Sequence, residues 1–274
     1  MSMSKKSKII IYVLLTIMAL YFLSPFVYML FTTFKTEAEA IAYPPKMFPK
    51  KWLVENYLNA WNAQPFGRYL WNSIVVTVGT TAGQIISCSL VAYGFARYNF
   101  KGKNVLFMIV MATMMIPGEA TIISNYLTVS RLKWLDSYQV LIIPYLTSAM
   151  GIFLFRQFYM TFPISLYESA KIDGCSNIKF IFRILIPLTK AAIGAMAVYT
   201  FINAWNMYMW PLLVTGSDSM RTVQIGIGML DSVDSQSISM MIAGVVMIII
   251  PSISVFLIGQ KQLIHGMFSG AVKG

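Results

Sequence analysis

The chain has 274 residues, of which 57% are hydrophobic and only 11% are charged, and its formal net charge is +11. Soluble domains carry about a quarter charged residues, so this composition argues against a soluble enzyme or binding domain. The positive charge does not indicate nucleic-acid binding. Basic residues that flank apolar segments set membrane topology, and no basic surface interleaved with aromatic residues accompanies them.

Six segments of the chain carry almost no charge and are long enough to cross a bilayer, which takes about 20 mostly apolar residues. They lack the alternating polarity of membrane β-strands, and backbone exposed to lipid must be satisfied within its own segment. We therefore expect an all-α membrane protein with a single transmembrane domain over residues 1–274. The predicted spans cover about 9–33, 70–96, 104–129, 138–156, 190–214 and 236–259.

The first predicted span follows Lys5, Lys6 and Lys8 and is far longer than the roughly 7–15 apolar residues of a signal peptide. We expect a retained anchor helix. With the N-terminus inside, 13 basic residues lie on the cytoplasmic side and 8 lie outside, which predicts that both termini are cytoplasmic. The first outer loop, about 35–68, contains prolines and aromatic residues and is expected to lie along the outer interface.

The second predicted span carries Gly79, Gly83 and Ser87 at helical spacing. Such a stripe of small residues lets another helix approach closely. It predicts a packing surface, either within the subunit or against a partner.

The third predicted span contains Glu119, the only carboxylate inside any of the six. An ionisable residue within the membrane is a functional candidate. The preceding Pro117 and Gly118 are expected to open the helix, so that Glu119 sits in water near the outer mouth. We favour a gating or hydrogen-bonding role for Glu119 over proton relay.

The second predicted inner loop, residues 157–187, contains the signals of two short helices. Pro163 suits the first position of a helix over 164–173, and Gly174 suits the position after its end, where a positive φ is common. Ser176 is an N-cap candidate for a second helix that runs to a break at Pro187. These signals alone leave two readings open, a helix-turn-helix that docks on a soluble partner and an amphipathic helix that rests on the bilayer.

The fifth predicted span places Tyr199, Asn203, Asn206 and Trp210 on one helical face. Aromatic rings and amide groups are what a neutral sugar needs. Trp and Tyr also belong to interfacial belts, however, and Asn can hydrogen-bond between helices. Both interpretations stay open.

The sequence gives little support for catalysis, nucleotide binding or metal binding by this chain. No Walker A pattern occurs, and His265, Cys88 and Cys175 lie too far apart in sequence to indicate a metal site. We expect no metal and no cofactor bound by this chain. A membrane-embedded enzyme would need convergent polar groups that a chain with one histidine and few carboxylates does not offer.

The second inner loop resembles the EAA loop of ABC importer permeases, with Ser169 and Cys175 at positions where alanine is usual. The residues that carry this resemblance are Glu168, Ala170, Asp173, Gly174, Ile184, Pro187 and Leu188. Further stretches are similar to the second permease of carbohydrate importers of the maltose or multiple-sugar type. They are Asn72–Ser73, Ala92–Arg97, Ile116–Pro117, Phe155–Gln157, Phe201–Pro211 and the terminal Gly270–Gly274.

This resemblance implies a multi-pass subunit of a bacterial inner membrane. With a second permease, it would form the translocation path for a sugar or oligosaccharide delivered by an extracellular binding protein. ATP and Mg²⁺ would be handled by separate dimeric ATP-binding subunits, so the chain is not itself an enzyme. The alternative is an ion-coupled secondary transporter, which one intramembrane carboxylate and no evident repeat argue against.

The resemblance also implies which residues meet the ATPase. The helix-turn-helix between spans four and five would couple to it as a cytoplasmic EAA element, and the C-terminal tail would reach into the ATPase pair. The implied coupling residues are Glu168, Ala170, Asp173, Gly174 and Pro187, and the implied tail residues are Gly270, Ala271, Val272, Lys273 and Gly274.

Overall fold

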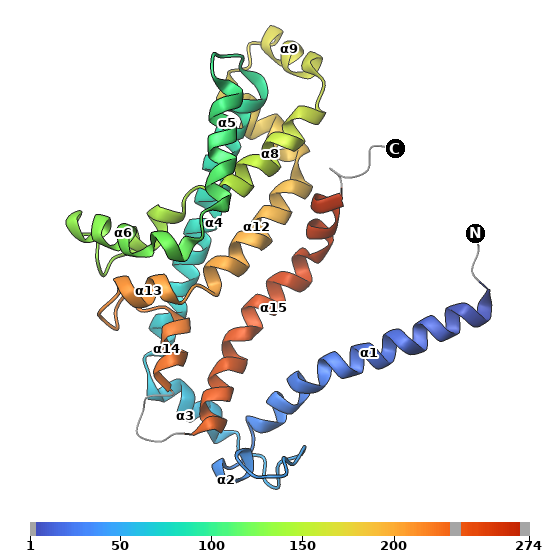
Figure 1. Ribbon diagram of the computed structural model, residues 1–274, viewed down its shortest axis with the longest axis vertical. Helices are drawn as coiled ribbons and strands as arrows, with labels where there is room; N and C mark the ends of the chain where they lie inside the picture. Colours follow the sequence, from blue (N-terminus) through green and yellow to red (C-terminus); the bar gives the residue numbers. More distant parts are fainter. Residues whose placement is uncertain (1–3, 231–236, 269–274) are drawn as a thin grey trace. The chain divides into compact units, whose positions relative to one another are not determined.

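The computed structural model describes residues 4–230 and 237–268, and every regular element in that part of the chain is helical (Figure 1). Three helical stretches are long and apolar enough to cross a membrane, namely Lys5–Thr32, Phe66–Arg97 and Ile238–Gln262. Three bent pairs of helices pass the same test when each pair counts as one span. The described residues therefore offer up to six spans, which confirms the expected all-α architecture.

The bent pairs differ in how sharply they turn. Lys103–Met115 and Gly118–Arg131 meet at 100°, Tyr138–Tyr145 and Ala149–Thr161 at 45°, and Asn177–Leu188 and Lys190–Trp205 at 86°. In chain order the elements are α1 (Lys5–Thr32), α2 (Glu37–Ala40), α3 (Glu55–Ala63), α4 (Phe66–Arg97), α5 (Lys103–Ala112), the 3₁₀-helix η1 (Thr113–Met115), α6 (Gly118–Arg131), α7 (Tyr138–Ile142), the 3₁₀-helix η2 (Ile143–Tyr145), α8 (Ala149–Thr161), α9 (Ile164–Ile172), α10 (Asn177–Phe180), the π-helix η3 (Ile181–Leu185), α11 (Ile186–Leu188), α12 (Lys190–Trp205), α13 (Met209–Val214), α14 (Val223–Leu230) and α15 (Ile238–Phe268).

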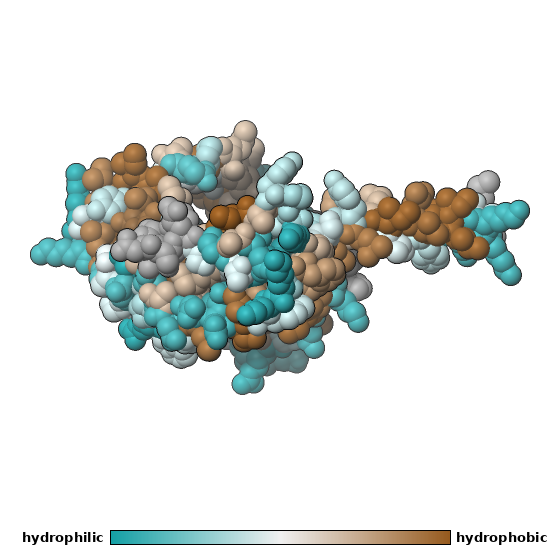
Figure 2. All heavy atoms as spheres, turned by 90° about the horizontal axis from the view of Figure 1, so that it is seen from below, coloured by the Kyte–Doolittle hydropathy of each residue, from teal (hydrophilic) through white to brown (hydrophobic). Residues whose placement is uncertain are grey.

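The chain divides into two compact units. The first comprises Met1–Phe66 and Gly226–Ile249, and the second comprises Gly67–Ile225 and Ile250–Gly274. In the first unit, α1 exposes apolar side chains on all sides, and its only buried residue is Thr32 near its end. Figure 2 shows the largely hydrophobic surface of this helix. A helix that is apolar all round is suited to a lipid environment.

The loop after α1 is folded around Lys35, whose side chain is fully buried. Its Nζ donates a hydrogen bond to the carbonyl oxygen of Lys46 at 2.6 Å and lies 4.1 Å from the centroid of the Tyr28 ring. Asn56 Nδ2 donates to the carbonyl oxygens of Thr33 and Lys35 at 2.8 and 2.9 Å. These bonds satisfy carbonyls that the end of α1 leaves free. This loop is therefore a structured cap on α1.

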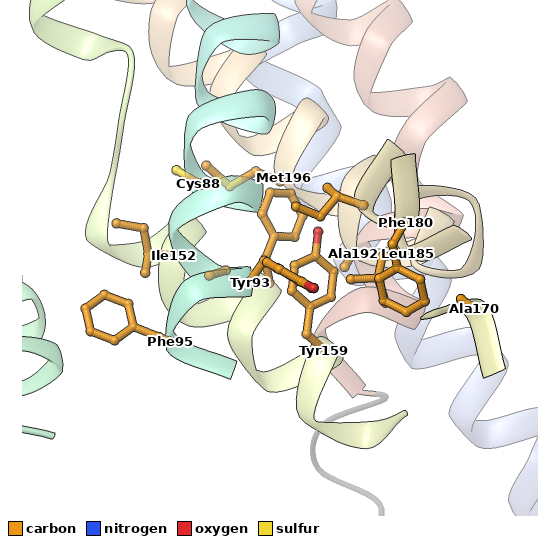
Figure 3. Packing of buried hydrophobic residues seen from close by; sticks show 13 residues of the cluster. Cys88, Tyr93, Phe95, Ile152, Tyr159, Ala170, Phe180, Leu185, Ala192 and Met196 are labelled. Atoms are coloured by element: carbon orange, nitrogen blue, oxygen red, sulfur yellow. The ribbon is translucent and has the colours of Figure 1, made fainter. Parts of the chain in front are cut away.

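Two clusters of buried apolar side chains hold the second unit together. The larger cluster joins α4, α8, α12 and the α9–η3 segment, and Figure 3 shows its packing. Its buried members are Cys88, Ala92, Tyr93, Phe95, Ile152, Phe155, Tyr159, Ala170, Phe180, Ile181, Leu185, Ala192 and Met196. The smaller cluster consists of Val76, Val129, Val140, Leu141, Trp210 and Val214.

Two predicted spans differ from the structure in their course. The fourth was expected as one helix over 138–156, but it breaks after Tyr145, and α8 continues to Thr161. Helix α8 contains no proline, and Pro163 restricts the residue before it, so the helix ends just ahead of that pair. The loop that follows is thus shorter than the predicted 157–187.

The fifth span was expected as one helix over 190–214, and this is wrong. Helix α12 ends at Trp205, and α13 starts at Met209. Pro211 has no amide hydrogen to donate to the carbonyl of Met207, and its ring crowds that carbonyl. The helix therefore stops before the proline and starts again in a new direction.

Candidate functional site

The candidate site is the helix-turn-helix formed by α9, α10 and η3 at one end of the second unit (Figure 1). Helix α9 ends in a Schellman motif. The N–H of Cys175 donates to the carbonyl of Ala170 at 2.9 Å, and the N–H of Gly174 donates to the carbonyl of Lys171 at 3.0 Å. Gly174 has φ +72°, which confirms the predicted positive φ. Ser176 then caps α10, as predicted, by accepting from the N–H of Lys179 at 3.3 Å.

Helix α9 has one face packed inward and one face exposed. Ala170 is buried in the larger cluster, and Figure 3 shows it beside Phe180 and Leu185. On the opposite side Ile164 and Ile172 are 64% and 87% exposed. Glu168 lies four residues from each of them and is also exposed, so the three share one face. The small side chain of Ala170 allows the helix to sit close to the cluster, while its outer face stays free for a contact.

The predicted break at Pro187 lies elsewhere in the structure. The helix passes Pro187 and ends at Leu188, and the chain bends by 86° around Thr189. A proline lacks an N–H group and clashes with the carbonyl four residues before it. The preceding π-turn, η3, places that carbonyl in a wider helix, where the clash is relieved. Pro163 is likewise the N-cap of α9 rather than its first helical residue, because its ψ of 147° is extended.

Arg97, at the end of α4, anchors the segment that leads into α9. Its Nη2 donates to the carbonyl oxygens of Tyr159 and Phe162, both at 3.2 Å. In the sequence, Arg97 stood out only within a family-like stretch. A basic residue that ends a long uncharged span could have indicated this contact with the backbone near the end of α8.

The small-residue stripe on α4 packs within this chain. A Cβ built on Gly79 would lie 3.1 Å from Ile142 Cδ1, and one on Gly83 would lie 2.2 Å from Leu146 Cδ2. Ser87 Oγ donates to the carbonyl oxygen of Leu146. Of the two alternatives left open by the sequence, the structure shows packing within the subunit, against the broken fourth span.

Gln84 lies on the same helix as the stripe and was not among the predicted site residues. Its Nε2 donates to the carbonyl oxygen of Tyr145 at 2.8 Å, while its Oε1 accepts from Thr200 Oγ1 at 3.0 Å. An amide inside a long uncharged span must find partners, because an unsatisfied polar group in an apolar environment is costly. The position of Gln84 within a long uncharged span was therefore the signal in the sequence that its amide has polar partners.

Trp210 does not share a face with the other three residues proposed for the substrate path. It belongs to α13 and is buried, and its Nε1 donates to the carbonyl oxygen of Val140 at 2.9 Å. Pro144 lies four residues after Val140 and cannot supply an N–H to that carbonyl. The indole takes the place of the missing helical donor. The prediction of one shared helical face was therefore wrong for Trp210.

Tyr199 and Asn203 lie on α12, Asn206 caps its end, and all three side chains are exposed. Asn203 Nδ2 donates to the carbonyl oxygen of Tyr199 at 2.8 Å, and Gln224 Nε2 donates to Asn206 Oδ1 at 3.3 Å. Their contact with a substrate stays a prediction.

Glu119 lies in the first turn of α6, directly after the break at Pro117, and is exposed. The prediction that Pro117 and Gly118 open the third span is thus confirmed. A carboxylate at this position is favoured by the helix dipole. Its role in gating stays a prediction.

Among the described residues, no group of three or more His, Cys, Asp or Glu side chains could hold a metal ion. Cys88 and Cys175 are both free thiols. The predicted ATPase-contacting tail, Gly270–Gly274, lies outside the described residues.

Comparisons with known proteins agree on the kind of protein. AraQ of Bacillus subtilis (strain 168), a permease protein of an arabinooligosaccharides transport system, is 37% identical over 227 residues, covering 82% of this chain and 81% of the relative. UgpE of Yersinia enterocolitica, a permease protein of an sn-glycerol-3-phosphate transport system, is 34% identical over 239 residues, covering 84% of this chain and 85% of the relative.

A solved structure shares the fold. A chain in the crystal structure of a bacterial ABC transporter involved in the import of the acidic polysaccharide alginate matches with a TM-score of 0.81 at 23% identity, covering 95% of this chain and 99% of that one. The family model of binding-protein-dependent transport system inner membrane components matches residues 85–262, well over half of the chain. The chain therefore belongs to the family of inner membrane components of binding-protein-dependent transport systems.

Proposed function

We propose that this chain is the transmembrane subunit of an ATP-driven importer and that it forms, with a second permease, the path for a sugar or oligosaccharide. In this proposal an extracellular binding protein delivers the sugar, and separate ATP-binding subunits bind ATP and Mg²⁺ and carry out hydrolysis. Membership in the binding-protein-dependent family supports this function over an ion-coupled secondary transporter. Relatives named for arabinooligosaccharides and sn-glycerol 3-phosphate support a polyhydroxylated substrate.

The observation that carries the proposal is the exposed apolar face of the helix-turn-helix. Ile164, Ile172 and Ile178 are 64%, 87% and 67% exposed. Exposed apolar side chains on these two short helices favour burial against a partner. The Schellman turn and the Ser176 cap fix the two short helices relative to each other, so the segment can move as one body when an ATP-binding subunit presses on α9. Glu168 and Asp173 border the face and supply polar contacts at its rim.

This assignment requires the helix-turn-helix to lie in the cytoplasm together with both termini. The excess of basic residues on that side supports this orientation. Single cysteines at Ser217 and Asn104, in a background without Cys88 and Cys175, test it in intact cells. An impermeant thiol reagent applied outside should label position 217 and miss position 104. Labelling of both would overturn the six-span topology.

The substrate path in this proposal includes Tyr199, Asn203 and Asn206, because amides can hydrogen-bond sugar hydroxyls and a ring can pack on a sugar face. Glu119 borders the outer mouth, and the tail Gly270–Gly274 meets the ATP-binding subunits. Deleting the tail should weaken transport or its regulation and leave membrane insertion intact. Unchanged uptake kinetics with an unchanged yield of the complex would count against a role for the tail.

The central experiment substitutes Gly174. Its φ of +72° strains a β-branched residue by about 1–2 kcal/mol, so Gly174→Val should distort the turn and lower ATPase binding or sugar uptake by about tenfold. Gly102→Val is the matched control, because Gly102 has φ +83° and, like Gly174, has no neighbour within 4 Å of an added Cβ. The measurements are pull-down of the ATP-binding subunits, ATP hydrolysis and sugar uptake by the reconstituted complex.

Two results would require withdrawal of the coupling role. One is full uptake and full ATPase binding by the Gly174→Val complex. The other is an equal loss in the Gly102→Val complex, which would show that backbone strain anywhere on this end of the molecule has the same effect.

A further inference from the structure

A single asparagine links the helix-turn-helix to the long helix α4. Asn177 follows the Ser176 cap and begins α10, and its side chain is half-buried. Its Oδ1 accepts hydrogen bonds from Tyr93 OH at 3.3 Å and from Tyr167 OH at 3.2 Å. Its Nδ2 donates to Tyr98 OH. One amide group thus joins α9, α4 and the connection that follows α4.

Each of the three tyrosines packs against a neighbouring ring. Tyr93 and Tyr98 meet edge to face with centroids 5.7 Å apart, and Tyr167 packs edge to face on Phe180 at 5.3 Å. Phe180 is fully buried in the larger cluster, and Tyr93 is 3% exposed. Tyr93 and Tyr167 therefore have little freedom, and their hydroxyl groups define the position of the amide oxygen, whereas Tyr98 is 45% exposed and meets the amide nitrogen from the surface side.

The chemistry of this junction suits an amide. Its oxygen has two lone pairs, which both phenol donors use, and its nitrogen supplies the donor that Tyr98 receives. Leucine has a similar size and can do neither. A carboxylate can accept but cannot donate. The junction therefore depends on the residue type at 177 as well as on its volume.

We propose that Asn177 is the positioning residue that transmits movement of α9 to α4. The inference rests on the proposed function, in which an ATP-binding subunit displaces α9. Displacement of α9 moves the Tyr167 hydroxyl, the amide follows it, and Tyr93 carries the shift to a buried position on α4. Helix α4 also holds Gln84 and Ser87 against the break in the fourth span, so a shift of α4 reaches the interior of the second unit.

The test compares Asn177→Leu with the wild-type complex, reconstituted with its ATP-binding subunits and binding protein. The side chains of the exposed face, Ile164 and Ile172, are unchanged, so pull-down of the ATP-binding subunits should equal that of wild type. Sugar taken up per ATP hydrolysed should fall about fivefold, the factor that corresponds to the loss of a typical hydrogen bond. A purely structural role would lower complex yield and leave this ratio unchanged.

Tyr167→Phe provides a second variant that keeps the ring packing and removes only one hydroxyl. It should lower the same ratio, and the double variant with Asn177→Leu should show no further loss, because residues that act through one contact are not additive. If Asn177→Leu fails to assemble, Tyr167→Phe alone decides the question. Asn99→Leu, at an exposed asparagine in the connection after α4, is the matched control and should leave the ratio at the wild-type value.

An unchanged ratio of uptake to hydrolysis in Tyr167→Phe would overturn the inference, as would an equal fall in Asn99→Leu. Failure of the proposed function gives a different result. In that case the wild-type chain itself does not bind ATP-binding subunits, and no ratio exists to compare.

Discussion

Two of the broken spans in the second unit are built in different ways. The break between η2 and α8 is supported by other helices, since Gln84 and Ser87 of α4 donate to the carbonyl oxygens of Tyr145 and Leu146. The break between η1 and α6 is supported locally. There Ile116 N–H donates to the carbonyl of Thr113, three residues away, and the bend reaches 100°.

The difference shows two ways to interrupt a helix within a membrane protein. Backbone groups released by a break must find partners, because lipid supplies none. Around residues 146–148 the partners come from α4, and the chain bends by only 45°. Around Pro117 the partners are neighbours in sequence, and exposed groups such as Glu119 remain. We expect the first break to be rigid and important for stability, and the second to be tolerant of change. Four experiments test this contrast.

The largest expected effect is that of Gly83→Val. An added Cβ would lie 2.2 Å from Leu146 Cδ2, so the Leu146 side chain at the supported break must shift. Overpacking of this kind typically costs about 1–3 kcal/mol, and we expect about 3 kcal/mol here. The free energy of unfolding in mixed micelles titrated with SDS is the measurement. Gly94→Val on the same helix is the control, because nothing lies within 4 Å of a Cβ there. Equal losses would refute close packing at Gly83.

A somewhat smaller effect is expected for Gln84→Leu. It leaves the carbonyl of Tyr145 and the hydroxyl of Thr200 without their amide partner, at a cost of about 2 kcal/mol in the same unfolding titration. Asn125→Leu is the matched control, since Asn125 is an exposed amide on α6 of the other broken span. The contrast between the two breaks is lost if Asn125→Leu proves as costly as Gln84→Leu.

Pro117→Ala should change stability by only about 0.5 kcal/mol. The φ of Pro117 is −59°, which alanine adopts without strain, so the loss comes mainly from the greater freedom of the unfolded chain. The same titration measures it. A loss above that of Gln84→Leu would mean that the break between η1 and α6 is held by contacts as strong as those around Tyr145.

The smallest effect concerns the connection between the two broken spans. Asp136 Oδ1 accepts from the N–H groups of Gly216 and Ser217, both at 3.1 Å. Burial acts to raise the pKa of Asp136, but these hydrogen bonds and the charge of Arg221 outweigh it, so the pKa lies below its ordinary value. A carboxyl with a lowered pKa contributes stability above its unfolded value of about 4, and that contribution is lost as the pH falls through the folded pKa.

Amide exchange tests this prediction. Protection factors at Gly216 and Ser217, which correct for the intrinsic effect of pH, should be constant from about pH 7 to pH 5 and should fall only below about pH 4. Asp136→Asn has no titrating group and should show a flat profile. A fall in protection already near neutral pH would contradict the assigned direction of the shift.

The sequence predicted features that depend on neighbouring residues and missed those that depend on distant ones. Pro117–Gly118 predicted a break in the third span. Gly174 and Ser176 predicted the turn and the cap of the helix-turn-helix. Each acts through the φ of one residue or through a bond that spans three or four positions. The six apolar segments were predicted for the same reason, because length and composition are local properties.

The contacts made by Gln84, Asn177 and Trp210 could not be predicted in this way. Gln84 and Tyr145 are 61 residues apart, as the sequence separation of their hydrogen bond shows, and Trp210 meets Val140 across 70 residues. Pro144 does indicate that the carbonyl of Val140 has no helical donor. Which side chain replaces that donor is decided by how the helices pack, and helical periodicity alone wrongly placed Trp210 on the face of Tyr199.

The reactivity of the Lys35 amine can report on opening of the loop that follows α1. Its amine is fully buried against Tyr28 and the carbonyl of Lys46, whereas Lys46, Lys50 and Lys51 are exposed on the same loop. An amine-reactive reagent should therefore modify those three lysines rapidly. It should modify Lys35 slowly, because it reaches that amine only when the loop opens. The ratio of slow to fast modification measures the free energy of that local opening. Opening of this cap on α1 could thus be followed by mass spectrometry without any engineered label.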